Sequence, residues 1–453
     1  MHRWIVPLTA LLLAGPAQAQ GIARDYAEAL VELTAPRWKG QVVDWPTPQP
    51  RPEGMAYVLR SSRRSVAVHA APGVGVEQAE QALEALEAAQ ELLDAAGWPS
   101  PYPDGGRGGT GEFDLYLETG VGKGADAFAD APVPWSLYDA VTSFAVVDPT
   151  VARGALPTCV ASAYAQAMLL GQDPAEARAW REATGAFAAW LVTGVLDCEG
   201  SVATWQQNPS RTWIGDHEPN VEPSGGALML TLLSARRDGG TGVFVRELWQ
   251  LARQRSGDLT GLRGSPDLWQ ALEADLDAAG GRLEDTMQAL ALRRYFAGRR
   301  ENADTPWPLR GLGPHATVPV RFQLDWAALP VRTRPADPPL EPYGTAYARV
   351  DVTEAPDDAL LRVWLRGEYG VQWSLVAVRL DAEGRELQRV TAPSRKIPRS
   401  YLPVQLDADT ARVLLVVTNL SSRIPDADTP DENVRSFTLI LDHGTSDTAL
   451  GPG

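Results

Sequence analysis

One stretch of the sequence decides how the first half of the chain is expected to fold, and it reads Cys159-Val160-Ala161-Ser162-Ala163-Tyr164-Ala165-Gln166-Ala167-Met168-Leu169-Leu170-Gly171. The stretch predicts a helix over about residues 158–171, and a second helix follows over 174–193 after a Gly-Gln-Asp-Pro break. Ser162 and Gln166 are four residues apart and therefore share one side of the first helix. Four apolar side chains can bury against a sheet: Ala161, Ala165, Met168 and Leu169.

The segments on either side of this helix pair predict a mixed α/β unit. Alternating or apolar runs at 65–70, 113–117 and 143–148 are typical of strands. Residues 76–96 carry an apolar stripe at three- and four-residue spacing, which predicts a long helix, and a Gly- and Pro-rich loop follows it. Further helices are expected at 225–237, 241–255, 266–279 and 283–298.

This order of elements, together with the motif region, resembles the core of secreted zincin-type metallopeptidases. In that family a helix carries H-E-x-x-H, so that two His side chains bind one zinc ion and the Glu activates its water. Val160-Ala161 and Ala167 match the positions around the motif, but Ser162 and Gln166 stand where the family has His. Ala163 stands where the family has the catalytic Glu.

The next helix, from Trp180 to Trp190, is similar to the segment that supplies the family's third zinc ligand, and it places Glu182 at that position. A catalytic zinc ion needs three protein ligands, so one carboxylate cannot hold it. The resemblance therefore implies a zincin-like fold with no catalytic residue, metal or cofactor at the degenerate positions Ser162, Ala163, Gln166 and Glu182.

The chain after residue 340 follows a different pattern. Short alternating runs at 346–352, 360–367, 373–380, 412–417 and 436–441 predict an antiparallel β-sandwich over 341–443. We therefore expect a zincin-like α+β domain at 56–300, a Pro-rich junction at 301–340, the sandwich, and a loose tail at 444–453. Residues 20–55 end in a Pro-rich run and read as an extended lead-in.

The first residues predict export. A basic start, an apolar run from Ile5 to Gly15 and the sequence Ala17-Gln18-Ala19 are typical of a cleavable signal peptide at 1–19. The alternative is a buried N-terminal helix. Signal-peptide cleavage would release a secreted or periplasmic protein, and no later run is long and apolar enough to predict a membrane span.

Two cysteines remain in the mature chain, Cys159 and Cys198. An even pair in an oxidising compartment suggests one disulfide between the ends of the helix pair. The alternative is two buried free thiols.

The formal net charge is −16, which argues against nucleic acid and anionic membrane surfaces as partners because both select clustered Lys and Arg. The expected partner is an unidentified extracellular or periplasmic ligand, either a protein or a carbohydrate. Exposed aromatic residues on the sandwich would favour a sugar-binding or adhesive role, although core packing is their more usual role. The candidates are Trp364, Tyr369, Trp373 and Tyr401.

The main reading is thus a secreted, catalytically inactive metallopeptidase-like protein that binds a ligand or serves as a structural module. The alternative is a secreted hydrolase with an unrecognised site. The one dense polar cluster that could form such a site is Asp216-His217-Glu218, although the favoured interpretation of this segment is a surface loop. A Ser-His-Asp hydrolase lacks support because the sequence has no G-x-S-x-G elbow.

Overall fold

We describe a computed structural model of the chain. The described residues are 42–109, 111–120, 124–152, 154–196, 198, 200–213, 223–255, 261–303, 305–306, 309–392, 399–420 and 433–444. The predicted signal peptide, the first part of the lead-in and nearly all of the predicted tail lie outside these residues. The described part is a mixed α/β structure with eight α-helices and four sheets, two of which pack as a sandwich.

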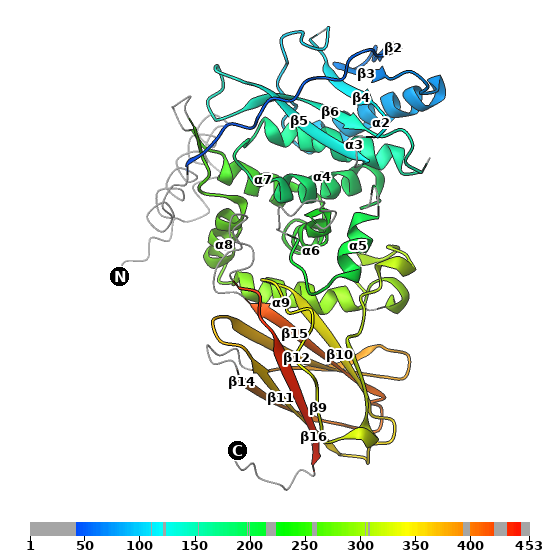
Figure 1. Ribbon diagram of the computed structural model, residues 1–453, viewed down its shortest axis with the longest axis vertical. Coiled ribbons are helices and arrows are strands. Elements are labelled where there is room, and N and C mark those ends of the chain that lie inside the picture. Colours follow the sequence, from blue (N-terminus) through cyan, green and yellow to red (C-terminus); the bar gives the residue numbers. More distant parts are fainter. Residues whose placement is uncertain are drawn as a thin grey trace, which may run out of the picture.

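A five-stranded mixed sheet forms the top of the molecule in Figure 1, in the order β2-β3-β4-β6-β5. Its strands are β2 (Tyr57–Arg60), β3 (Val66–Ala70), β4 (Phe113–Leu117), β5 (Ala125–Pro132) and β6 (Val141–Val147). The three inner strands are parallel, and β2 and β5 run antiparallel at the two edges. The inner strands were predicted, whereas the Ala- and Asp-rich β5 has low β-propensity and depends on its pairing with β6.

One face of this sheet is covered by α2 (Val76–Ala95) and α3 (Leu156–Leu170), and α4 (Arg178–Thr193) packs on α3. The apolar stripe of α2 and nearly all of α3 are buried in one core with the strands. The second helix of the pair begins four residues later than predicted. Glu176 lies within these four residues, outside the helix, and its carboxylate accepts a hydrogen bond from the Leu268 N–H at 2.8 Å.

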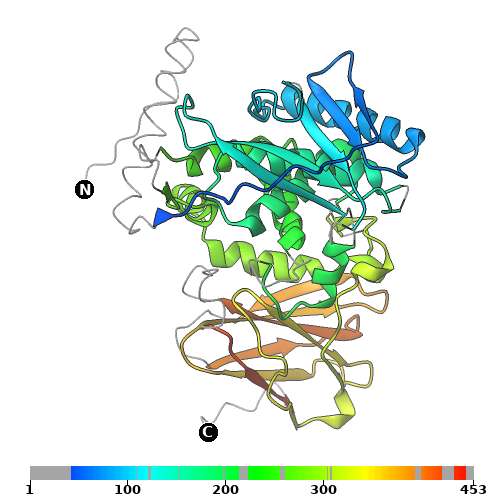
Figure 2. The same ribbon diagram turned by 45° about the horizontal axis from the view of Figure 1, so that its top comes forward.

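The other face of the sheet is crossed by residues 44–56, which belong to the described part of the lead-in and are extended (Figure 2). The first described element of the lead-in is β1 (Val42–Val43), which pairs with β7 (Leu262–Arg263). The Gln49 N–H donates to the Ala129 carbonyl of β5 at 3.2 Å, and Met55 packs against the aromatic side of the sheet. The lead-in is therefore part of the folded unit.

Five helices lie between this unit and the sandwich (Figure 1). They are α5 (Ser201–Gln207), α6 (Ala227–Arg237), α7 (Val243–Ala252), α8 (Leu268–Ala278) and α9 (Leu283–Tyr295). All but α5 were predicted, with bounds that differ by a few residues. The short α5 escaped prediction because seven residues carry too little periodicity.

The C-terminal half forms two facing sheets, in the orders β13-β12-β15-β10-β8 and β14-β11-β16-β9. Their strands are β8 (Phe322–Asp325), β9 (Val331–Arg332), β10 (Thr345–Asp351), β11 (Leu360–Gly367), β12 (Gln372–Leu380), β13 (Glu386–Thr391), β14 (Arg399–Gln405), β15 (Arg412–Leu420) and β16 (Phe437–Gly444). Residues 322–332 fall within the predicted Pro-rich junction, but β8 and β9 complete one edge of each sheet. The strands β8 and β9 are too short for an alternation of apolar and polar residues to be visible in the sequence.

The helices and the sandwich share a buried contact along α9. The Tyr347 hydroxyl of β10 donates to the Ala291 carbonyl at 2.6 Å, and Tyr295 packs with Val376 and Val378 of β12. Because this contact is apolar and extensive, the two halves touch through a core rather than through a linker alone. The division into separately folding domains stays a prediction.

The disulfide between Cys159 and Cys198 is confirmed, with the two Cα atoms 4.8 Å apart. It ties the first turn of α3 to the chain just after α4. Among the described residues, none of the helices combines the length and apolar character that a membrane crossing requires.

Candidate functional site

The helix pair α3 and α4 carries the four residues that were predicted to stand in a degenerate zinc-binding motif. Ser162 and Gln166 lie on the side of α3 that faces α4, and both are buried. The Gln166 side-chain amide donates a hydrogen bond to the Ser162 hydroxyl at 3.3 Å. Ala163 is fully buried in the core and offers no polar atom.

Gly185 of α4 closes the space beside this pair. A Cβ atom on Gly185 would lie 2.7 Å from Gln166 Cγ and 3.0 Å from the Ser162 carbonyl oxygen. Distances this short mean that the two helices approach each other as closely as glycine allows. The helix contact therefore leaves little room for an ion or a ligand between Ser162 and Gln166.

Glu182 lies one turn before Gly185 on α4 and is also buried. Its carboxylate accepts a hydrogen bond from Arg178 Nε at 2.8 Å, within the same helix. Arg178 also binds Asp126 of the edge strand β5 through its Nη2 atom. Arg178 thus neutralises the charge of Glu182. The i, i+4 spacing of the two residues on one helix is a signal from which this ion pair could have been predicted.

A zinc ion does not fit this donor set. Zinc prefers thiolate, imidazole and carboxylate ligands, whereas Ser162 and Gln166 offer a neutral hydroxyl and a neutral amide. Glu182 is the one carboxylate and is engaged by Arg178. Across the residues that the structure describes, no group of three or more His, Cys, Asp or Glu side chains is placed to hold a metal ion.

Replacing Gly185 with Val is expected to lower the free energy of unfolding by about 1–3 kcal/mol, because the new side chain must push α3 and α4 apart. Denaturant unfolding measures the change. Gly154→Val is the matched control, since a Cβ atom there meets nothing within 4 Å. Equal stability of the Gly185 variant and the wild type would contradict the close helix contact.

The Asp216-His217-Glu218 cluster lies outside the described residues. His69, by contrast, is buried on β3, where its Nε2 atom lies 2.8 Å from Asp114 Oδ1 and its ring stacks on Tyr116. Asp114 and Tyr116 belong to a second polar centre, on the opposite face of the sheet from the helix pair, and His69 lies beside it.

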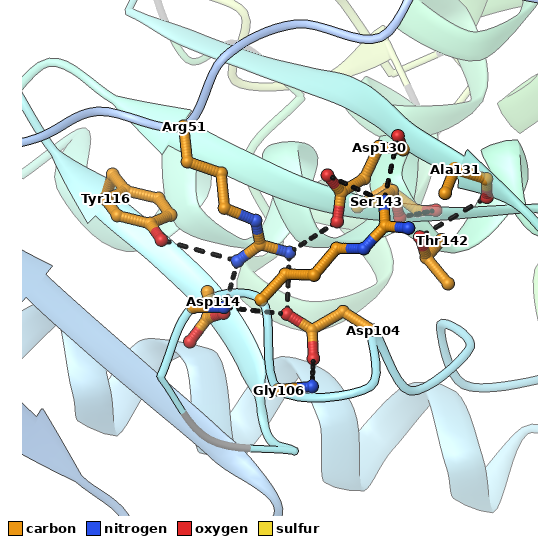
Figure 3. A network of polar contacts seen from close by, with 12 residues as sticks. Arg51, Asp104, Gly106, Asp114, Tyr116, Asp130, Ala131, Thr142 and Ser143 are labelled. Atoms are coloured by element: carbon orange, nitrogen blue, oxygen red, sulfur yellow. Dashed lines mark hydrogen bonds and ion pairs between the residues drawn. The ribbon is translucent and has the colours of Figure 1, made fainter.

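We call this centre the Arg51 cluster, and Figure 3 shows its arrangement. It consists of Arg51, Asp104, Asp114, Tyr116 and Asp130. The Arg51 guanidinium comes from the lead-in and binds all three carboxylates, two of them at 2.7 and 2.8 Å. The three Asp side chains come from the Gly-rich loop, β4 and β5.

Burial alone would lower the pKa of Arg51, but its hydrogen bonds to Asp130 and Tyr116 outweigh burial and raise that pKa well above the ordinary value. The same burial raises the pKa of Tyr116. Arg51 therefore stays charged and fastens the lead-in across the sheet. Sequence reasoning missed the cluster because its members are separated by up to 79 residues and form no motif.

A further group of buried carboxylates lies where α4 and α8 begin. Burial raises the pKa of Asp173 to about 7, with Asp139 adding to the rise. Burial also raises the pKa of Glu176 well above its ordinary value, and nearby Asp267 and Asp173 reinforce it. Arg181 donates to the Glu176 backbone carbonyl at 2.6 Å, and the guanidinium of Arg253 also interacts electrostatically with Asp173.

These raised pKa values predict that the protein is less stable at mildly alkaline pH than at mildly acidic pH. A carboxyl with a raised pKa in the folded state holds a proton that the unfolded chain releases, so its contribution is lost as pH rises through about 7. For Asp173 we expect a fall on the order of 1 kcal/mol per pH unit between about pH 4, where the unfolded carboxyl begins to release its proton, and about pH 7, where the folded carboxyl releases it.

Denaturant unfolding across this window measures the slope, and Asp173→Asn should make it shallower. Asp148→Asn is the control, because hydrogen bonds from Thr150 and Gly120 outweigh burial and lower the pKa of Asp148, so that it titrates below the window. If Asp173→Asn left the slope of the free energy of unfolding against pH unchanged, Asp173 would not be the source of the pH dependence.

No protein-family model matches the chain, and a sequence search finds no match among curated proteins. The site must therefore be interpreted from its own residues and geometry.

Proposed function

We propose that this chain is a secreted, catalytically inactive protein with a zincin-like N-terminal half, and that it acts by binding a ligand. A metallopeptidase of this type uses a helix pair below a mixed sheet to hold zinc and to activate a water molecule. Here the corresponding pair is α3, which follows β6, and α4.

The proposal rests on one observation: at the α3–α4 contact the polar side chains are already bonded to other groups of the protein and the helices pack closely. Ser162 and Gln166 bond to each other, Gly185 fills the space beside them, and Glu182 is held by Arg178. With Ala163 in place of a Glu, no carboxylate stands at the position that would activate a metal-bound water molecule in a metallopeptidase of this type.

Export is part of the proposal. The N-terminal basic, apolar and Ala-Gln-Ala order supports it, and a disulfide between Cys159 and Cys198 is compatible with an oxidising compartment. Mass measurement of the secreted form should find an N-terminus near Gln20; cytoplasmic protein that keeps Met1 would count against export.

The inactive state is tested with a peptidase assay on the purified mature protein, using unfolded casein as a general substrate in the presence of added zinc. We expect no activity above the background of a mock purification. Activity that a zinc chelator abolishes would overturn the proposal. Activity that survives the chelator would favour the alternative of a hydrolase with a different site.

A further inference from the structure

The outer face of the four-stranded sheet of the sandwich presents an aromatic row that crosses all four strands. Tyr401 of β14 lies opposite Trp364 of β11, Trp364 opposite Ile440 of β16, and Ile440 opposite Arg332 of β9. The Trp364 and Tyr401 rings are 5.2 Å apart between centroids, with an interplanar angle of 38°. Both are partly exposed, so the pair forms an apolar platform on the surface.

Arginines surround this platform. Arg366 and Arg399 lie directly opposite each other in the row next to the aromatic pair, and Arg332 ends the aromatic row itself. All three are exposed, and within the described ranges none of them makes an ion pair or a side-chain hydrogen bond. In the row on the other side of Trp364, Arg362 lies opposite Asp442, so the positive charge of this face is concentrated on the side of Arg366 and Arg399.

The Arg366–Arg399 pair is the informative feature. Like charges directly opposite on neighbouring strands repel and destabilise a sheet. A guanidinium presents a planar fork that matches a carboxylate, so an anion bound between the two side chains would remove this repulsion. The repulsion between Arg366 and Arg399 therefore destabilises the sheet locally, and an acidic ligand would reduce this repulsion.

We propose that this surface, which we call the aromatic–arginine face and define as Arg332, Trp364, Arg366, Arg399, Tyr401 and Ile440, binds an acidic polysaccharide of the uronate type. A pyranose ring has an apolar C–H face that can lie on Trp364 and Tyr401, because aromatic side chains combine a large flat apolar area with little conformational freedom. The ring carboxylate then reaches Arg366 and Arg399.

The juxtaposition of flat rings and arginines favours a sugar over an acidic peptide. Asp and Glu side chains bring a carboxylate but no rigid apolar face to lie on the platform. Successive outward residues on one strand are about 7 Å apart, which places the arginines beside the rings rather than over them. This spacing suits a ligand whose stacking face and charge belong to one small ring.

The other aromatic candidates from the sequence do not contribute. Trp373 is buried in the core of the sandwich, and its indole N–H donates to the Glu368 carbonyl at 3.0 Å. Tyr369 is 73% exposed but lies in the loop after β11, away from the aromatic row. The inference therefore rests on Trp364 and Tyr401.

This inference gives a ligand class to the proposed binding role and rests on that role. The test measures binding of polygalacturonate oligosaccharides to the full mature protein by isothermal titration calorimetry. We expect saturable binding that weakens as salt is added, because part of the attraction is electrostatic. A neutral glucan of similar length should bind much more weakly.

Two variants separate the two parts of the face. Arg366→Thr/Arg399→Thr should weaken binding at least about tenfold and make it less sensitive to salt, while its melting temperature stays equal or rises because the repulsion is gone. Trp364→Leu should also weaken binding about tenfold but leave the salt dependence in place. The matched control is Arg263→Thr/Arg299→Thr, which removes two exposed arginines elsewhere and should bind as the wild type does.

Absence of polygalacturonate binding would overturn the inference, as would equal binding by the double arginine variant. Equal or tighter binding of polyglutamate or of single-stranded DNA would overturn the assignment to a sugar. None of these outcomes concerns zinc or peptidase activity, so failure here is distinguishable from failure of the inactive-site proposal.

Discussion

Arg51→Met is expected to lower the free energy of unfolding by about 3–5 kcal/mol, because it leaves three carboxylates without their shared cation. Asp104 and Asp114 are buried, Asp130 is nearly so, and only 12% of the Arg51 side chain is exposed. Water therefore cannot replace the lost guanidinium. The lead-in would also lose the contact that fastens it to the sheet, so proteolysis within residues 44–56 should become faster.

A surface ion pair provides the control for this prediction. Arg60 lies 3.7 Å from Glu112, and 55% of its side chain is exposed. Arg60→Met should therefore cost less than about 1 kcal/mol. A loss no larger than that of the Arg60 variant would show that the Arg51 cluster contributes little.

The second large effect concerns the disulfide. Cys159→Ala/Cys198→Ala is expected to cost about 3–4 kcal/mol, since the bridge closes a loop with a sequence separation of 39 and restricts the unfolded chain. Alanine is chosen because Cys159 is fully buried and a serine hydroxyl there would add a separate cost. Denaturant unfolding of the oxidised wild type and the variant measures the difference.

Reduction of the wild type offers an independent check of the same quantity. Unfolding under reducing conditions should bring the wild type to the stability of the alanine variant, and the variant itself should not respond to the reductant. A difference below about 1 kcal/mol would mean that the loop is already constrained in the unfolded chain.

The elements with strong periodicity could be predicted from the sequence alone. The long helix α2 shows its apolar stripe, and the core strands β3, β4 and β6 appear as apolar or alternating runs. The cysteine count suggested the one disulfide. In each case a local pattern and the tertiary environment agree, which is where sequence reasoning is strongest.

Elements that depend on a neighbour could not be predicted. The edge strand β5 owes its conformation to β6, and β8 and β9 are too short to show a pattern before they join the sandwich. The predicted start of the second helix, at residue 174, is four residues too early because the Gly-Gln-Asp-Pro break gives no signal that the loop continues beyond Pro174. In the structure Glu176 instead bonds to the first turn of α8, 92 residues away along the chain.

The candidate site was predictable in its composition but not in its environment. The neutral character of Ser162, Ala163 and Gln166 follows from the sequence. The role of Arg178 in holding Glu182 and Asp126, and the closeness of Gly185 to α3, depend on how the helices and β5 pack. The Arg51 cluster left no local signal at all, because its acidic members are spread over the loop, β4 and β5.

The account depends most on the inability of the α3–α4 contact to hold zinc. Equilibrium dialysis of the folded, mature protein against zinc, followed by metal analysis, tests this most directly. We predict far less than one equivalent of bound zinc, and no change when Glu182 is replaced by Gln. One tightly bound equivalent that is lost in the Glu182→Gln variant would contradict the account, because it would show that this carboxylate serves a metal rather than Arg178.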